Sequence, residues 1–482
     1  MQEIFPLVTL VALAVIIVSV TIVFLNSWAM ALVLTLVLSL WAGLASASAT
    51  VHRCLTVFFS LLAVVNLPKR MVFLVPEQSP WSQYLVLILP TLYYGIVILA
   101  PKLPRIIASP LLRVEKLVLT YLVLALTTTW LSPGATFLGR LAASGLFLLP
   151  WTMILIAMRW GWEALPNVSR TLVFWGVINV IYGLWLFIFG PTLVELRWAE
   201  SAEFSIGARH LIAAMSGEGS QGVWRVIGLQ SDGFTFGLFL LISLIGLEVL
   251  KAYGQISRLV YVGLFSLLLF GIGLSMVRTI WVAFAVFIVT RWVIEHSTLL
   301  RHTWLIPLSL VGMFLLATWI ANTLYQFTPQ VRTISNPLLA RILTPGTLAA
   351  RKDALTIFFD TLPERLIIGI GYGINPYVTS KLGSTINLPP NFEAHNVFVE
   401  QLWYVGLPGL LIFALILYEA FTRLALRYFE SNQRERRVLA VLFAGLLALL
   451  ATGFSNGGVF LDYPFFFFLG VATLRKQRNV EA

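Results

Sequence analysis

Charge and cysteine are both scarce in this sequence. Only 11% of its 482 residues are charged, whereas a soluble domain carries roughly 25%. Cys54 is the single cysteine, which excludes a disulfide framework and any cysteine metal cluster. The first apolar run, near 4–25, lacks a basic leader and is long enough to span a membrane, so we expect no cleavable signal peptide. No internal repeat is visible, which argues against a repeat-built transporter.

Apolar residues are abundant instead. They make up 59% of the chain, and the mean hydropathy is +0.91. This composition predicts an all-α protein, a polytopic transmembrane helical bundle surrounded by membrane lipids. The net charge of +11 does not indicate a nucleic-acid partner, because membrane proteins concentrate Lys and Arg on the cytoplasmic side.

Apolar runs of roughly 17–25 residues mark the expected spans. They predict about 12–14 spans, near 4–25, 28–48, 55–75, 84–100, 112–131, 136–158, 171–190, 226–250, 259–276, 279–295, 304–324, 396–422, 437–455 and 459–474. We divide this single membrane domain into N-terminal spans at 1–190, a first outer loop at 191–225, central spans at 226–325, a large outer loop at 326–395 and C-terminal spans at 396–482.

The basic residues indicate the orientation of the spans. With a cytoplasmic N-terminus, the short outer loops hold only a few of them, namely Lys69, Arg70, Arg140 and Arg278. The positive-inside rule then predicts that both termini are cytoplasmic and that both long loops lie outside. These two loops are the segments with room for a sizeable polar site. We expect an amphipathic piece near 206–215 in the first and a short helix near 348–362 in the second.

A candidate for chemistry lies where the second loop meets the membrane. There, His395 and Asn396 open a long apolar run, and ionisable residues at such positions are often functional. Asn391 is the expected N-cap, which puts His395 in the opening turns of the helix, where the dipole favours the neutral imidazole of a general base. Asn396 and Glu400 are four residues apart and are predicted to share a helix face, from which Glu400 can orient a substrate hydroxyl. The alternative is an interfacial histidine that hydrogen-bonds water and a backbone carbonyl.

Arg278 is a second candidate. It ends Ser275-Met276-Val277-Arg278, the polar interruption in the middle of the apolar stretch 259–294. That stretch would be about 54 Å long as a helix, against a bilayer core of ~30 Å, so it must turn at this point. We therefore expect Arg278 at the outer membrane edge, either facing an anionic partner or reaching toward lipid headgroups.

Arg225 is the third candidate, at the end of the first outer loop and three residues before Gly228. Alone it would be an interface anchor. Two arginines in one outer pocket would suit phosphate oxygens, which guanidinium groups bind bidentately without losing their charge. Arg351 reads as part of a solvated loop face that can also reach a substrate. The run GIGYG around Tyr372 lacks the GK[ST] of a nucleotide site, but its glycines allow tight turns or close backbone approach.

These motifs, in this order across residues 225–410, resemble those of the bacterial O-antigen ligase and polymerase family. The similar features are R-x-x-G at Arg225, S-x-x-R ending at Arg278, and GIGYG followed by the H-N pair at His395. The resemblance implies a glycosyltransferase of the bacterial inner membrane with a periplasmic active site, about twelve spans, and neither a metal nor a cofactor. Arg225 and Arg278 would bind the diphosphate of an undecaprenyl-diphosphate-linked glycan, and His395 would act on the acceptor hydroxyl, with inversion. Asn396, Glu400, Arg351 and Tyr372 would support the site.

This family contains two types of enzyme, ligases and polymerases, which differ in the acceptor that they use. A ligase would use the lipid A–core oligosaccharide and a polymerase the next lipid-linked repeat unit; we favour the polymerase slightly. The alternative class is a lipid-linked oligosaccharide flippase or another secondary transporter, in which charges near the bilayer midplane are expected. Here the candidate charges cluster at the outer edge. No acidic cluster suited to a metal is predicted there, so we expect cationic side chains to stabilise the leaving diphosphate.

Overall fold

The computed structural model describes residues 50–66, 70, 90–201, 226–230, 232–296, 366–375, 396–456 and 461–474. Within these ranges every regular element is a helix, and six helical stretches are long and apolar enough to cross a membrane. The prediction of an all-α polytopic bundle is thereby confirmed, and the protein is a multi-pass membrane protein. The spans predicted near 4–25, 28–48 and 304–324, the amphipathic piece near 206–215 and the short helix near 348–362 lie outside the described residues.

The chain divides into two compact units. Unit 1 comprises Met1–Ser109 and Trp160–Trp281, and unit 2 comprises Pro110–Arg159 and Val282–Ala482. The division falls inside two helices, α9 (Thr152–Phe189) and α14 (Arg278–His296).

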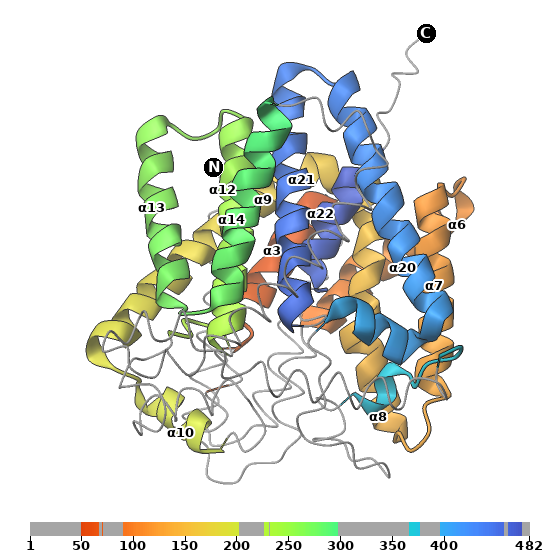
Figure 1. Cartoon of the computed structure of the whole chain (residues 1–482). Coiled ribbons are helices and arrows are strands. Elements are labelled where there is room, and N and C mark those ends of the chain that lie inside the picture. The colour runs from red at the N-terminus through yellow and green to blue at the C-terminus, as the bar shows by residue number, and fades with distance from the viewer. Residues whose placement is uncertain are drawn as a thin grey trace, which may run out of the picture. The chain divides into compact units, whose positions relative to one another are not determined.

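Unit 1 is built around α12 (Gly233–Ala252). Its other described helices are α3 (Val51–Val64), the π-helical turn Tyr94–Leu99, α6 (Ala100–Ala108), α10 (Leu193–Ser201), α13 (Arg258–Leu274) and the part of α9 from Trp160 onward. Asp232 caps α12 by accepting a hydrogen bond from the Thr235 backbone N–H at 2.8 Å. From Phe236 to Leu250 every residue of α12 is buried, as expected for a helix that is apolar on all sides. α13 packs beside it (Figure 1, green).

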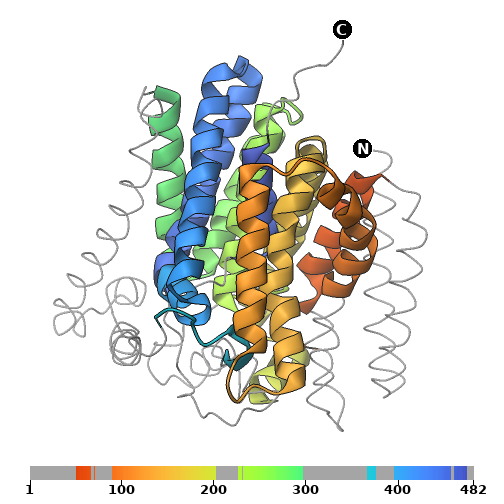
Figure 2. The same ribbon diagram turned by 90° about the vertical axis from the view of Figure 1, so that its right-hand side faces the viewer.

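Unit 2 is built around α20 (Val397–Glu430). α7 (Arg113–Trp130), α21 (Gln433–Asn456) and α22 (Tyr463–Thr473) all pack against α20, and α8 (Phe137–Ala143) follows α7 in the chain. Figures 1 and 2 show α7 in orange beside α20 in blue. α20 therefore contacts the two helices that follow it in the sequence and also α7, which lies more than 250 residues earlier.

α20 is broken near its start. Gly406 has φ +78° and Pro408 follows it; the first conformation strongly favours glycine, and proline has no N–H for the helix ladder. The Phe398 and Phe413 rings lie on opposite sides of the break, yet their centroids are 5.6 Å apart. In a straight helix fifteen residues would separate them by about 22 Å. The break thus folds the first segment of α20 back against the second.

The region of the predicted sixth and seventh spans differs from expectation. Two spans near 136–158 and 171–190 were predicted with a cytoplasmic connection between them. Instead, α8, the π-helical turn Ser144–Leu148 and a 3-10 turn lead into α9, which is 38 residues long and contains Pro166. Residues 159–170 are therefore helical. Hydropathy detects where a chain becomes polar, but tertiary packing can continue a helix through such a stretch, and Ala164, Leu165 and Val168 are completely buried here.

Candidate active site

The predicted site residues that the structure describes fall in both units. Unit 1 holds Arg278; unit 2 holds Tyr372, Asn396 and Glu400. The remaining candidates, Arg225, Arg351 and His395, lie outside the described residues. We call Val226–Gln230, the start of α12 and the turn 275–278 the arginine end of unit 1, and we call residues 366–375 together with 396–407 the glycine junction of unit 2.

The predicted turn before Arg278 is present. α13 ends at Leu274 and α14 begins at Arg278, which is half-buried. Met276 lies between them with φ +53°, a conformation that is uncommon for a residue other than glycine. The Ile272 carbonyl accepts hydrogen bonds from the Ser275 hydroxyl at 2.7 Å and from the Trp281 indole at 3.1 Å. These bonds stabilise the turn at the start of α14.

The turn and the segment after Arg225 pack on consecutive residues of α12. A Cβ added to Gly228 would lie 2.6 Å from the Phe236 ring, and a Cβ added to Gly237 would lie 2.9 Å from the Ser275 hydroxyl. Gly228 also has φ +52°, which explains the glycine of R-x-x-G. Both motif segments are therefore packed against the same end of α12.

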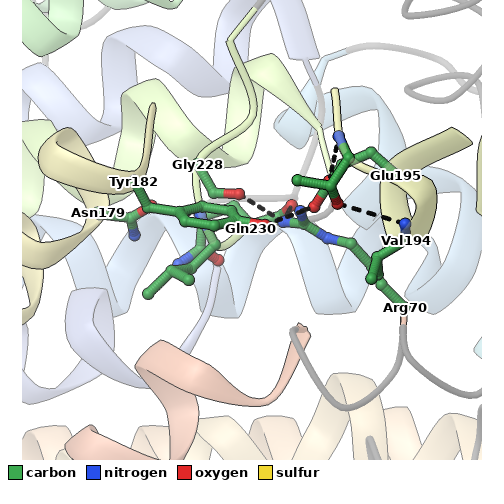
Figure 3. A network of polar contacts seen from close by, with 9 residues as sticks. Arg70, Asn179, Tyr182, Val194, Glu195, Gly228 and Gln230 are labelled. Atoms are coloured by element: carbon green, nitrogen blue, oxygen red, sulfur yellow. Dashed lines mark hydrogen bonds and ion pairs between the residues drawn. The ribbon is translucent and has the colours of Figure 1, made fainter. Parts of the chain in front are cut away.

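A buried polar network supports the arginine end (Figure 3). Arg70 is completely buried and donates hydrogen bonds to the Glu195 carboxylate at 3.0 Å, to the Gly228 carbonyl at 2.7 Å and to the Gln230 carbonyl. The Asn179 side-chain oxygen accepts the N–H of Leu229 at 2.7 Å. The sequence predicts Arg70 only as a basic residue of a short outer loop, and it gives no signal for Glu195 or Asn179. A buried charge is costly without a partner, but the sequence does not show that Arg70 is buried.

The glycine junction is held by backbone hydrogen bonds. The Ile370 N–H donates to the Trp403 carbonyl and the Gly371 N–H to the Tyr404 carbonyl, each at 2.9 Å, and the Leu407 N–H donates to the Leu366 carbonyl at 2.7 Å. The GIGYG segment thus pairs with the broken part of α20, where carbonyls and N–H groups lack their usual helical partners.

Three glycines make this pairing possible. Gly369, Gly371 and Gly406 have φ of +70°, +75° and +78°. A Cβ at Gly371 would lie 2.1 Å from the Ser132 hydroxyl and 2.2 Å from the Thr128 carbonyl, and a Cβ at Gly369 would lie 2.6 Å from the Gly406 nitrogen. The prediction that the GIGYG glycines allow close backbone approach is confirmed for Gly369 and Gly371, and α7 supplies the backbone that approaches Gly371.

Tyr372 lies inside the junction and is only 6% exposed. Its ring stacks between Phe147 and Tyr404, with centroid distances of 5.1 and 4.6 Å. Its hydroxyl is 3.2 Å from the Gln401 side-chain oxygen and 3.3 Å from the Tyr121 hydroxyl. Burial raises the pKa of Tyr372 above that of an ordinary tyrosine, so the hydroxyl stays protonated and joins the GIGYG segment to α20.

The start of α20 corrects two predictions. Asn396, not Asn391, is the N-cap: its side-chain oxygen accepts the N–H groups of Phe398 at 3.0 Å and Val399 at 3.2 Å. The described helix therefore begins at Val397, one residue after its cap, and His395 lies outside the described residues. Asn396 has an extended backbone, so it does not share a helix face with Glu400 as predicted; Glu400 itself lies in the first turn and is half-buried. Both asparagines suit a cap, and local sequence does not rank them.

Comparison with protein families gives one match. Residues 263–414 match the family described as O-antigen ligase. The matched region contains the turn before Arg278, the glycine junction and the break in α20, whereas Arg225 precedes it. No curated protein and no solved structure matches the chain. The match supports the family predicted from the motifs: residues 263–414 of this multi-pass membrane protein are similar to the O-antigen ligase family.

Proposed function

We propose that the protein is a glycosyltransferase of the bacterial inner membrane, with both termini cytoplasmic and its site on the periplasmic face. It transfers a glycan from an undecaprenyl-diphosphate-linked donor to a sugar hydroxyl of the acceptor. One observation carries the proposal: the segment that follows Arg225 and the turn that bears Arg278 pack on Phe236 and Gly237, consecutive residues of α12. Two guanidinium groups at one helix end suit a diphosphate, which presents two charged phosphoryl groups.

The arginines have an electrostatic role in this proposal. When the bond between the anomeric carbon and the phosphate oxygen breaks, negative charge develops on the leaving undecaprenyl diphosphate. Arg225 and Arg278 stabilise that charge, and the half-buried position of Arg278 strengthens its effect because solvent screens it less. Neither a metal nor a cofactor takes part.

His395 has the proton-transfer role. It takes the proton of the acceptor hydroxyl while the hydroxyl oxygen forms the new bond to the anomeric carbon, and in-line displacement inverts that centre. Asn396 caps the helix that follows His395, and the positive end of the helix dipole favours the neutral imidazole that a base requires. Glu400, one turn later, orients the acceptor, Tyr372 holds the junction together, and Arg351 adds a cation from the second outer loop.

The test is a transfer assay with purified protein, an undecaprenyl-diphosphate-linked glycan and a separate acceptor. We expect His395→Ala to lower the rate by about 10²–10⁴-fold and to leave donor binding intact. His296→Ala is the control, because His296 is exposed at the end of α14 and contacts the Trp292 carbonyl of the same helix. An active His395→Ala protein would contradict the base assignment.

Two additions to the assay decide further points. Wild-type activity should survive excess EDTA, and its loss would contradict the metal-free mechanism. Transfer to lipid A–core oligosaccharide identifies a ligase, and transfer to a second lipid-linked repeat unit identifies a polymerase.

A further inference from the structure

The segment Val226–Gln230 is held by an unusually polar set of contacts for a buried piece of chain. All five residues are buried, and none belongs to a helix or strand. Buried backbone groups outside regular structure need other partners. Two of the carbonyls, those of Gly228 and Gln230, accept hydrogen bonds from the Arg70 guanidinium.

Arg70 is itself oriented by Glu195. The two groups form an ion pair at 3.0 Å in which both side chains are almost completely buried, at 0% and 1% exposure. Glu195 is oriented in turn by the Tyr182 hydroxyl at 2.7 Å and by the backbone N–H of Thr192 at 3.0 Å. Figure 3 shows the guanidinium between the carboxylate on one side and the Gly228 carbonyl on the other.

A buried ion pair is weak evidence for stability, because replacing both partners with neutral groups is often neutral or stabilising. Its better-attested use is to specify one arrangement of the groups around it. Here the groups that the pair arranges are the carbonyls of the segment that directly follows Arg225. A guanidinium fork can satisfy several acceptors in one fixed geometry, which an ammonium cannot do.

We propose that Arg70 and Glu195 are positioning residues for donor binding: they hold Val226–Gln230, the segment that directly follows the proposed diphosphate ligand Arg225, in a single conformation. This inference rests on the proposed function for its ligand, but the fixed segment can be tested without it. Neither residue need touch the donor, since both are buried.

The test variant is Arg70→Met/Glu195→Gln. It removes both charges together, so no charge remains buried alone, and glutamine keeps an oxygen for Tyr182 and Thr192. The control is Arg159→Met/Glu115→Gln, which removes the ion pair between Arg159 and Glu115, at 2.8 Å, where α7 begins in unit 2. Its carboxylate is also completely buried.

Two measurements are made on each purified double variant. The first is hydrogen exchange of the peptide that covers Val226–Gln230; we expect exchange about tenfold faster or more in the test variant and no change there in the control. The second is the KM for the undecaprenyl-diphosphate-linked donor, which we expect to rise about tenfold, the effect of losing one charge-assisted hydrogen bond, with the acceptor KM unchanged.

The outcomes separate this inference from the proposed function. Unchanged hydrogen exchange in the test variant overturns it whatever the activity. Faster exchange with an unchanged donor KM overturns the role in donor binding. Faster exchange with a raised donor KM, in a variant whose melting temperature matches that of the control, supports the positioning role over a merely structural one. If the wild type transfers no glycan, the proposed function and the role in donor binding fail, while faster exchange still supports the fixed segment. If the test variant does not fold, Arg70→Lys is measured instead, and a wild-type exchange rate and donor KM in it overturn the inference.

Discussion

The arginine end and the glycine junction each hold a non-helical backbone segment in place, but they use different interactions to do so. At the arginine end, side chains from distant parts of the chain bind the backbone, as when Arg70 holds the carbonyls of Gly228 and Gln230. At the glycine junction the hydrogen bonds join backbone to backbone. Gly369 and Gly371 have no side chain of their own, which lets them lie close to their neighbours. The first should therefore be sensitive to groups that are removed and the second to atoms that are added.

The largest effect is expected from adding one methyl group to the junction. In Gly371→Ala the new Cβ would lie 2.1 Å from the Ser132 hydroxyl and 2.2 Å from the Thr128 carbonyl, at φ +75°. Steric crowding and backbone strain together should cost about 2–5 kcal/mol of folding stability, measured as thermal unfolding in detergent and as yield of folded protein. Gly263→Ala in α13 is the control, because a Cβ there would meet open space among the described residues outside its own helix backbone. Equal stability of the two variants would contradict the close approach.

The next effect concerns activity at the arginine end. Arg278→Lys should lose glycan transfer almost as completely as Arg278→Ala, because an ammonium cannot supply the planar fork that binds two phosphate oxygens. Both variants should remain folded, since Arg278 is half-buried at the beginning of α14. Arg258→Lys is the matched control, because Arg258 is the exposed first residue of α13. Full transfer by Arg278→Lys would show that a point charge is sufficient.

A smaller effect tests the corrected start of α20. Asn396→Ala removes the oxygen that accepts the N–H groups of Phe398 and Val399, which should lower the free energy of unfolding by about 1 kcal/mol. Asn396→Asp keeps an accepting oxygen and should match the wild type in chemical denaturation. If instead Asn391→Ala were the destabilising change and Asn396→Ala were silent, the helix would begin earlier than Val397.

The smallest effect is expected from Tyr372→Phe. The variant removes one buried hydroxyl but keeps the ring that stacks on Tyr404, and Tyr121 still donates to Gln401. The loss should be about 0.5–1.5 kcal/mol. Because burial raises the pKa of Tyr372, the folded state holds the proton more tightly than the unfolded state, so this contribution is complete below pH ~10 and decreases as the pH rises through the raised pKa. A loss of transfer at neutral pH in the folded variant would give the hydroxyl a direct role.

Much of this architecture was predictable from the sequence because its causes are local. Long apolar runs form helices in a membrane, since only internal hydrogen bonds can satisfy their backbone, and the helices α13, α14 and α21 begin and end within a few residues of the predicted spans. The turn before Arg278 follows from length alone. The glycines of GIGYG indicate a positive φ or a close approach of two backbone segments, because no other residue tolerates both.

The tertiary structure alone decided the rest. The ion pair joins Arg70 to Glu195 across 125 residues. The sequence around either residue does not identify its partner. α20 breaks at Gly406 and folds Phe398 back onto Phe413, and Asn396 takes the cap for which Asn391 was equally suited. In each case the decision depends on which groups the folded chain brings within hydrogen-bonding or packing distance, and that distance is a property of the whole fold.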